Sequence, residues 1–350
     1  MNRRRTVIST LLGGVLVALL ANCGGGSGAP VDNYLSRLGR SLDRDIEPAA
    51  QRLPPLPRAR DLQLDLASGS IDLLDLFSLR GCELNVTIGK SNSSLGKLAN
   101  DSQRLLLELE FLTLAPACIA ALDPIEDAEL VSTLTTAVAS KQQQLPARIW
   151  NATLGGPEFR SFWKRPTRLG SYPDDTGGQV PTALERLAQL TARWLAGDYR
   201  AGSGELETLL ADVRRGDGGA LLASLELQRS GLAAAEPALA ERAQPAPLCF
   251  GKTASPEGRI VDTVVRKFFI GEVQPWSVDI ARRRAELMPA VLSLEDQLAS
   301  VLPAAYQAWS QQRDQLLASA MLAPREHARS LAALLETCGL RPGVEPAKPG

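Results

Sequence analysis

Apolar residues at helical spacing run through most of this chain and constrain its fold more than any other feature. Their intervals of three, four and seven residues place the side chains on one helix face. Leucine and alanine outnumber valine and isoleucine, and aromatic residues make up only 5% of the chain, which favours helices over sheet. We therefore predict an all-α fold, an irregular multi-helix bundle with long loops. The longest stripe comprises Ile280, Leu287, Val291, Leu294, Leu298, Leu302, Tyr306, Trp309 and Leu316.

Prolines and capping residues divide the rest of the chain into further helices. Proline removes a helix hydrogen bond, so we expect it to end each helix that it follows. Asp101 is the predicted cap of a very apolar helix that should lie in the core. The predicted helices run from Val31 to no further than Pro48, from Asp101 to Pro116 and Cys118, and from Asp123 to about Gln144.

Three stretches predict other local structure. The proline-rich run 53–57 predicts an extended strap. Residues 145–180 hold several prolines and glycines, so we expect a long loop or two short elements, with a possible subdivision of the domain there. Residues 260–269 fit helical spacing, but their β-branched side chains leave a strand as the alternative.

Residues 1–22 have the form of an export signal. Residues 3–5 are arginines, residues 7–21 are apolar, and Cys23 follows. The apolar stretch is shorter than the roughly 20 residues that span a bilayer, although a retained anchor is the alternative. We predict cleavage before Cys23 and acylation of its sulfur and new amino group. The general secretion and twin-arginine routes both stay open.

Acylation of Cys23 would organise the chain into an anchor, a tether and a domain. Residues 23–30 would form the lipidated cysteine and a flexible tether, whose last seven residues reach roughly 15 Å. Residues 31–340 would form a single α-helical periplasmic domain, and residues 341–350 a disordered tail. Because Gly24 follows Cys23, the signal resembles those of outer-membrane lipoproteins in Gram-negative bacteria. We therefore expect an outer-membrane anchor that faces the periplasm, with the lipid bilayer as a partner.

Four further cysteines predict two disulfides in an oxidising compartment. Cys82, Cys118, Cys249 and Cys338 allow three pairings. We favour Cys82 with Cys118 and Cys249 with Cys338, because each pair would close one half of the chain. Buried free thiols are the alternative.

Composition gives little support for a metal site or a nucleic-acid partner. The chain has one histidine and neither a CxxC nor an HExxH motif, so we expect no metal and no cofactor. His327 is expected on a solvated helix face. The formal net charge of −1 does not favour nucleic-acid binding. Asp61, Asp65, Asp72, Asp75 and the arginines at 282–284 are expected on solvated faces.

Two short motifs suggest catalysis only weakly. Gly89-Lys90-Ser91 lacks the preceding glycine of a phosphate-binding loop, since Leu84 stands at that position. Ser94 and Lys97 have the Ser-x-x-Lys spacing of penicillin-binding enzymes, in which the lysine amine reaches the serine hydroxyl. The central sheet of those enzymes is not predicted here. A serine-acyl hydrolase using Ser94 and Lys97 is therefore kept as an alternative function.

Two segments stand out as candidate binding surfaces. Residues 80–97 turn polar within a leucine-rich chain, and residues 145–180 concentrate aromatic side chains beside a Gly-Gly-Pro turn. Ordinary packing of a long loop is the alternative for the aromatic segment. The candidate surface residues are Lys90, Asn92, Ser94, Lys97, Trp150 and Trp163.

Several motifs together resemble a family of proteobacterial lipoproteins that is classed only as a domain of unknown function. The resemblance covers about residues 30–340. It implies export, lipidation and a Gram-negative source, and it implies no known activity or catalytic residue. The motifs are Tyr34-Leu35-Ser36-Arg37-Leu38, Pro57 to Leu62, Leu79 to Leu84, Asn92 to Lys97 with Ser102-Gln103-Arg104, Cys118, and Trp150-Asn151-Ala152.

These observations predict a membrane-anchored periplasmic lipoprotein. They favour a binding protein without enzymatic activity over an enzyme. Its partner would be another envelope protein or a small ligand. A structural subunit of an envelope complex is a further alternative.

Overall fold

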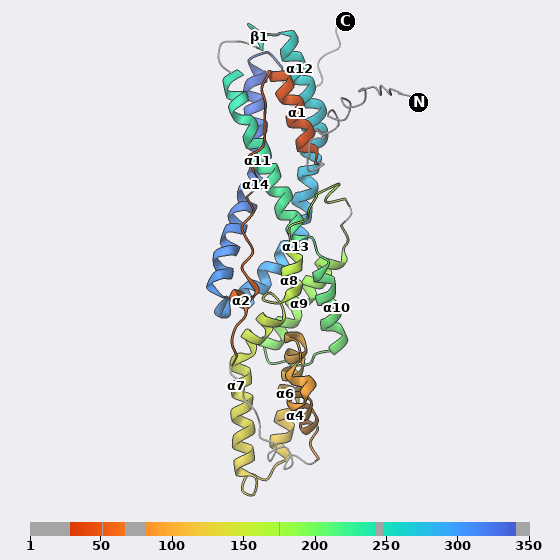
Figure 1. Ribbon diagram of the computed structural model, residues 1–350, viewed down its shortest axis with the longest axis vertical. Helices are drawn as coiled ribbons and strands as arrows, with labels where there is room; N and C mark the ends of the chain where they lie inside the picture. Colours follow the sequence, from red (N-terminus) through yellow and green to blue (C-terminus); the bar gives the residue numbers. More distant parts are fainter. Residues whose placement is uncertain (1–28, 51, 67–80, 175, 243–247, 341–350) are drawn as a thin grey trace, which may run out of the picture.

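The computed structural model describes residues 29–340 except 51, 67–80, 175 and 243–247, and this part of the chain is almost entirely helical, as predicted (Figure 1). Its strands are the two-residue antiparallel pair β1 and β2. The elements are α1 Pro30–Leu42, α2 Ala59–Leu62, α4 Leu84–Asn92, α5 Ser94–Lys97, α6 Asp101–Ala121, α7 Ala128–Ala152, α8 Pro157–Phe162, α9 Gln179–Leu195, α10 Ser203–Arg214, α11 Gly218–Arg242, β1 Cys249–Phe250, β2 Thr253–Ala254, α12 Pro256–Val264, the π-helix η1 Val265–Val273, α13 Gln274–Gln297, the 3-10 helix η2 Ala299–Val301 and α14 Ala304–Glu336.

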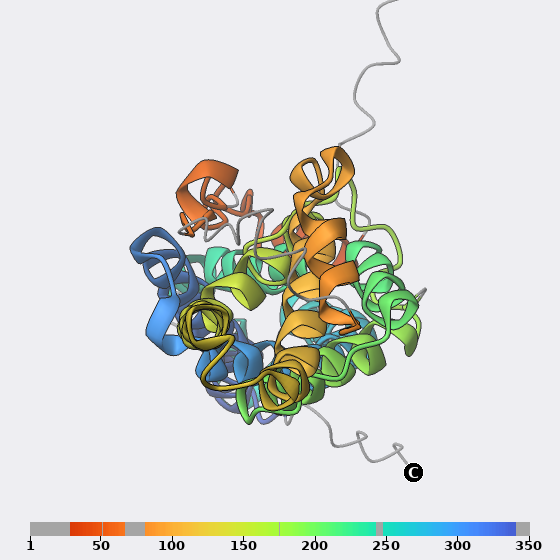
Figure 2. The same ribbon diagram turned by 90° about the horizontal axis from the view of Figure 1, so that it is seen from below.

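The helices form an elongated molecule. α1, β1 and α12 lie at one end, α8, α9 and α10 lie in the middle, and α4, α6 and α7 form the opposite end (Figure 1). α11 and α14 make the most extensive helix pair, and α6 with α7 makes the next. Seen from the α6 and α7 end, α7 points almost directly at the viewer, so it runs along the long axis (Figure 2).

The first described helix docks onto the body through its apolar face. Pro30 occupies the first turn of α1, where its missing N–H is not needed, and Asp43 ends the helix in the left-handed conformation at φ 52°. The buried face of α1 packs on α11, α12 and η1. Val31, Tyr34, Leu35, Leu38 and Leu42 form that face.

Two helices continue through prolines that were expected to end them. α6 runs past Pro116 to Ala121, and α7 runs past Pro146 to Ala152. A proline inside a helix costs about 3 kcal/mol, whereas burying one large apolar side chain gains about 1.5–3 kcal/mol. Leu145, Ile149 and Trp150 are buried around the α7 proline, and Ala115 and Cys118 around the α6 proline. Side-chain burial therefore outweighs the lost hydrogen bonds.

Other local predictions are corrected or decided by the structure. The polar segment, described from Gly81 onward, is helical rather than a loop, because it forms α4 and α5. Residues 260–269 are helical, so the strand alternative is wrong. Asn100, not Asp101, caps α6, since its side chain accepts a hydrogen bond from the Gln103 N–H at 2.9 Å. The region 145–180 begins with the end of α7 and then α8.

Both predicted disulfides are present. Cys82 is bonded to Cys118, which ties the segment before α4 to α6, with 5.8 Å between their Cα atoms. Cys249 is bonded to Cys338, which ties β1 to the turn that follows α14, with 5.0 Å between their Cα atoms. The alternative of buried free thiols is therefore wrong.

Two charged or polar residues expected on the surface are buried. His327 is 1% exposed, and its ring bonds to the Tyr34 hydroxyl and to Glu236, each at 2.7 Å. Arg283 is 3% exposed, and its guanidinium donates two hydrogen bonds to Asp217, at 2.6 and 2.9 Å. Each is satisfied by partners from distant parts of the chain, which local sequence pattern cannot reveal.

Candidate ligand cavity

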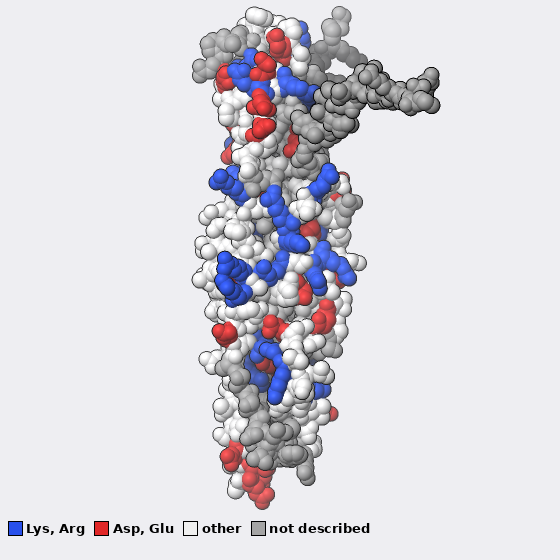
Figure 3. Space-filling model, viewed as in Figure 1, with Lys and Arg blue, Asp and Glu red and all other residues white. Residues whose placement is uncertain are grey.

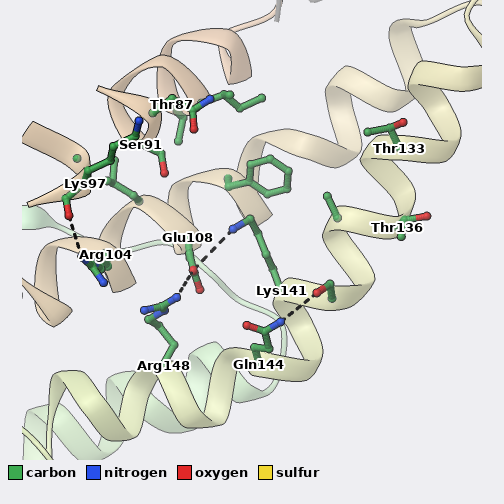
Figure 4. Close-up of a pocket in the computed structure, with 17 residues that line it drawn as sticks. Thr87, Ser91, Lys97, Arg104, Glu108, Thr133, Thr136, Lys141, Gln144 and Arg148 are labelled. Atoms are coloured by element: carbon green, nitrogen blue, oxygen red, sulfur yellow. Dashed lines mark hydrogen bonds and ion pairs between the residues drawn. The ribbon is translucent and has the colours of Figure 1, made fainter. Parts of the chain in front are cut away.

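A cavity of about 520 Å³ lies between α4, α5, α6 and α7, at the end of the molecule remote from α1 (Figures 1 and 4). This volume falls in the range of small-molecule sites, about 300–1,000 Å³. Its wall combines cations, hydroxyls and apolar side chains: Thr87, Ile88, Ser91, Asn92, Gly96, Lys97, Arg104, Leu107, Glu108, Phe111, Thr133, Thr136, Ala137, Ser140, Lys141, Gln144 and Arg148.

Helical spacing brings these side chains together. Arg104, Glu108 and Phe111 stand at intervals of four and three residues, so they share one face of α6. Lys141 and Arg148 stand seven residues apart and share one face of α7. Because α6 and α7 pack along each other, the two faces meet across the cavity.

Glu108 is the single carboxylate among the described residues of the wall, and it serves two cations. Its Oε1 accepts a hydrogen bond from Arg148 Nη2 at 2.8 Å and lies 3.6 Å from Lys141 Nζ (Figure 4). The Glu108 and Arg148 side chains are only 14% and 12% exposed. Lys141 Nζ also lies 5.2 Å from the centre of the Phe111 ring, a cation–π contact.

The short helix α5 brings Lys97 to the wall as a third cation, and Arg104 of α6 is the fourth. The Ser93 side chain accepts a hydrogen bond from the Gly96 N–H at 3.0 Å and so caps α5. Lys97 follows at the end of α5, and its carbonyl accepts a hydrogen bond from Arg104 Nη2 at 2.9 Å. The cap and this hydrogen bond together fix the position of α5 against α6.

Some buried polar atoms of the wall have no hydrogen-bond partner in the described part of the protein. They are Thr87 Oγ1, Glu108 Oε2 and Arg148 Nε. A buried polar atom without a partner costs about 1–3 kcal/mol. Three of these atoms belong to side chains of this one wall.

Only some of the predicted surface residues of the polar segment 80–97 line the cavity. Asn92 and Lys97 line the cavity. Lys90 does not, because its amine pairs with Glu110 at 3.1 Å. Ser94 is exposed and also lies outside the cavity wall, and the described structure has no hydrogen bond between Ser94 and Lys97. Ser94 and Lys97 are therefore not brought together as a nucleophile and base.

The two predicted surface tryptophans are core residues instead. Trp150 is fully buried, and its Nε1 donates a hydrogen bond to the Leu62 carbonyl at 2.6 Å. Trp163 is 6% exposed and packs edge-on against Trp309. The adjacent Asn151 side chain exchanges two hydrogen bonds with the Leu64 backbone, at 2.8 and 3.0 Å. Trp150 and Asn151 thus hold residues 62–64 against α7 rather than form a binding surface.

Most of the charged side chains of the cavity wall were not predicted from the sequence. Arg104, Glu108, Lys141 and Arg148 were assigned no role, although their helical spacing is visible in the sequence. The missing information was that α6 and α7 pack side by side, which places the two charged faces opposite each other.

Several predictions lie outside the described residues, namely the leader 1–22, the lipidation of Cys23, the tether up to residue 28, the solvated faces of Asp72 and Asp75, and the tail 341–350. Within the described residues, no helix has both the length and the apolar character needed to cross a bilayer. The chain matches no curated protein and no solved structure. A family model described as Protein of unknown function (DUF3080) matches residues 31–342, which is most of the chain. The protein therefore belongs to the DUF3080 family.

Proposed function

We propose that the protein is a lipid-anchored envelope protein that binds a ligand in the α4–α7 cavity without catalysing a reaction. The observation that carries this proposal is the cavity itself, whose wall holds three buried polar atoms without partners. A binding role also fits the separation of Ser94 from the cavity wall.

The leader supports the anchor. Residues 1–22 have the pattern of an export signal, and Cys23 stands where lipoprotein processing would cut. Several acyl chains on Cys23 would hold the protein at the membrane, since each buried methylene contributes about 0.8 kcal/mol. The two disulfides fit an oxidising compartment such as the periplasm.

The shape of the molecule supports a cavity held away from the bilayer. α1, which follows the tether, and the cavity lie at opposite ends of the molecule (Figure 1). The 25 residues of α7 alone extend about 37 Å along the long axis. Acidic side chains gather at the α6–α7 end (Figure 3), which an anionic membrane surface would repel. The proposed ligand would therefore be met in the periplasm.

The anchor is tested by the intact mass of the protein extracted from membranes. We expect the mass of acylated residues 23–350, with four thiols that react only after reduction. An unprocessed chain with four reactive thiols would contradict both the anchor and the compartment.

The cavity is tested with a matched pair of α7 variants. Ala137 lines the cavity, whereas Ala139 is exposed outside it. Thermal unfolding of the full chain is measured with fractions of periplasmic small molecules and cell-wall digests. We expect at least one fraction to raise the Tm of wild type and Ala139→Trp but not that of Ala137→Trp. Equal responses of all three proteins would show that the cavity is not the site.

Covalent probes test the non-catalytic part of the proposal. We expect neither a fluorophosphonate nor a β-lactam to label the protein. Labelling of wild type that is lost in Ser94→Ala would instead establish the serine-acyl hydrolase. A stoichiometric partner in mild detergent, with no effect of Ala137→Trp on any ligand, would instead indicate a structural subunit.

A further inference from the structure

We propose that the ligand of the α4–α7 cavity carries two oxyanion groups, carboxylates or phosphates, on a short apolar body. This proposal rests on the binding function proposed above and names the chemistry of its ligand. It follows from how the charged side chains are paired, first on the α7 side of the cavity and then on the α5–α6 side.

The charges on the wall do not balance. Lys97, Arg104, Lys141 and Arg148 line the cavity with one carboxylate, Glu108, among the described residues. Lys141 and Arg148 are partly buried, whereas Lys97 and Arg104 are exposed to solvent. Cations grouped around a concave site create a positive potential that attracts anions. The wall has three more cations than carboxylates, so its charge favours an anionic ligand over a neutral or a cationic one.

The α7 side offers the first anion subsite. Both Arg148 and Lys141 turn to the same oxygen of Glu108, at 2.8 and 3.6 Å. Arg148 Nε is buried and has no partner in the described structure. A guanidinium presents five N–H donors in a planar fork, so Arg148 can donate to a ligand oxygen through another N–H while Nη2 keeps its bond to Glu108.

The α5–α6 side offers the second anion subsite. Arg104 donates through Nη2 to the backbone carbonyl of Lys97, so the guanidinium lies beside the backbone of Lys97, and both residues line the cavity (Figure 4). Neither Lys97 nor Arg104 forms an ion pair with a carboxylate in the described part of the protein. These two cations lie across Glu108 from Lys141, so one compact anion would compensate only one of the pairs (Figure 4).

The cavity wall also has an apolar part. Ile88 and Phe111 are buried there, and Leu107 and Ala137 line the same cavity. The unpartnered Thr87 hydroxyl adds one hydrogen-bond donor or acceptor. Apolar side chains in a wall that also carries two pairs of cations match a molecule with two anionic groups on a hydrocarbon body.

The experiment is a calorimetric titration of the full chain with straight-chain dicarboxylates from succinate to suberate. Hexanoate tests the need for a second anion, and 1,6-diaminohexane tests the sign of the charge. Hexane-1,6-diyl bisphosphate distinguishes phosphate from carboxylate recognition. We expect an optimum length at which the dianion binds at least about tenfold more tightly than hexanoate, with no binding of the diamine. Added salt should weaken dianion binding.

Charge-neutral variants assign the two subsites. Lys97→Gln and Arg148→Gln should each weaken the best dianion about tenfold while leaving hexanoate within a few-fold of its wild-type affinity at the other subsite. Lys90→Gln is the control, because Lys90 pairs with Glu110 outside the cavity wall, and it should leave affinity unchanged. Glu108→Gln keeps an acceptor for Arg148 but removes the competing negative charge, so it should tighten dianion binding several-fold.

The outcomes separate this proposal from the binding function beneath it. If a periplasmic fraction stabilises wild type but not Ala137→Trp while no dianion binds, the cavity is a site and the dianion proposal is wrong. If dianions bind wild type and Ala137→Trp equally, they bind elsewhere, and the dianion proposal is wrong. Equal affinity for dianions and hexanoate would also overturn it.

Discussion

The Tyr34 hydroxyl lies 2.7 Å from Nε2 of His327, although the two residues are 293 positions apart in the chain. Both side chains are buried, and the other ring nitrogen of His327 bonds to Glu236 at 2.7 Å. Phe269 of the π-helix η1 packs edge-on against the same histidine ring. This cluster fastens α1, the first described helix, to α11, η1 and α14.

Removing the Tyr34 hydroxyl should loosen this attachment. Tyr34→Phe keeps the ring but leaves His327 Nε2 buried without a partner, so we expect a loss of about 1–3 kcal/mol in the free energy of unfolding. Urea unfolding measures it. Tyr199→Phe is the control, because the Tyr199 hydroxyl bonds to an exposed Gln142 side chain. An unchanged stability of Tyr34→Phe would contradict the role of this hydrogen bond.

The Glu236 carboxyl should make stability depend on acid pH. Burial alone would raise its pKa, but hydrogen bonds from His327 and Ser330 together hold the pKa below its usual value of 4.5. A folded-state pKa below the unfolded one stabilises the protein above about pH 4.5, and this contribution is lost as the pH falls through the folded value. The Tm difference between wild type and Glu236→Gln should therefore shrink below pH 4.5. A difference that stays constant down to pH 3 would contradict this.

A second buried network should be sensitive to the loss of one partner. Arg313 is fully buried and forms a bidentate pair with Glu295, at 2.6 and 2.9 Å, and Tyr306 donates to the same carboxylate. Glu295→Ala removes the bidentate partner and leaves the guanidinium with Asp314 alone, whose side chain is 48% exposed, so we expect a loss of about 3–5 kcal/mol by urea unfolding.

Removing both charges of this pair should cost less than removing one. The double variant Glu295→Leu with Arg313→Met leaves no buried charge without a partner, so it should be more stable than Glu295→Ala. If the double variant were the less stable one, packing by Arg313 on Trp163 and Trp309 would outweigh the charge pair.

The two disulfides should differ in their contribution to stability. Cys249 and Cys338 are 89 positions apart, and Cys82 and Cys118 are 36 apart. The chain-entropy relation then gives about 4.6 kcal/mol for the longer loop and about 3.8 kcal/mol for the shorter one. Replacing each pair by serine and measuring urea unfolding tests the order. The opposite order would show that native packing around Cys82 and Cys118 matters more than loop length.

Local sequence pattern predicts the elements of this fold better than their ends. The helical spacing of leucines identifies an all-α chain, and an oxidising compartment predicts two disulfides. The pairing of Cys82 with Cys118 and of Cys249 with Cys338 follows from the expectation that each closes one half of the chain. Pro116 and Pro146 mislead, because the cost of proline in a helix is local, whereas the burial that outweighs it comes from neighbouring helices.

Buried polar groups and the cavity could not be predicted in the same way. His327 and Arg283 read as surface residues because their partners, Tyr34 and Asp217, lie 293 and 66 positions away. Lys97 was selected from a polar segment, whereas Arg148 was overlooked within the segment 145–180, which was singled out for its aromatic side chains. The packing of α6 against α7 decides which charged faces lie opposite each other. The residue pattern of a single sequence does not reveal this packing.

The most direct test of the account is native mass spectrometry of the protein extracted gently from its own membranes, as wild type, Ala137→Trp and Ala139→Trp. We predict that wild type and Ala139→Trp carry the mass of acylated residues 23–350 plus one small-molecule adduct, and that Ala137→Trp carries the acylated mass alone. An adduct of the same mass on all three proteins, or on none of them, would contradict a lipid-anchored protein that binds its ligand in the α4–α7 cavity.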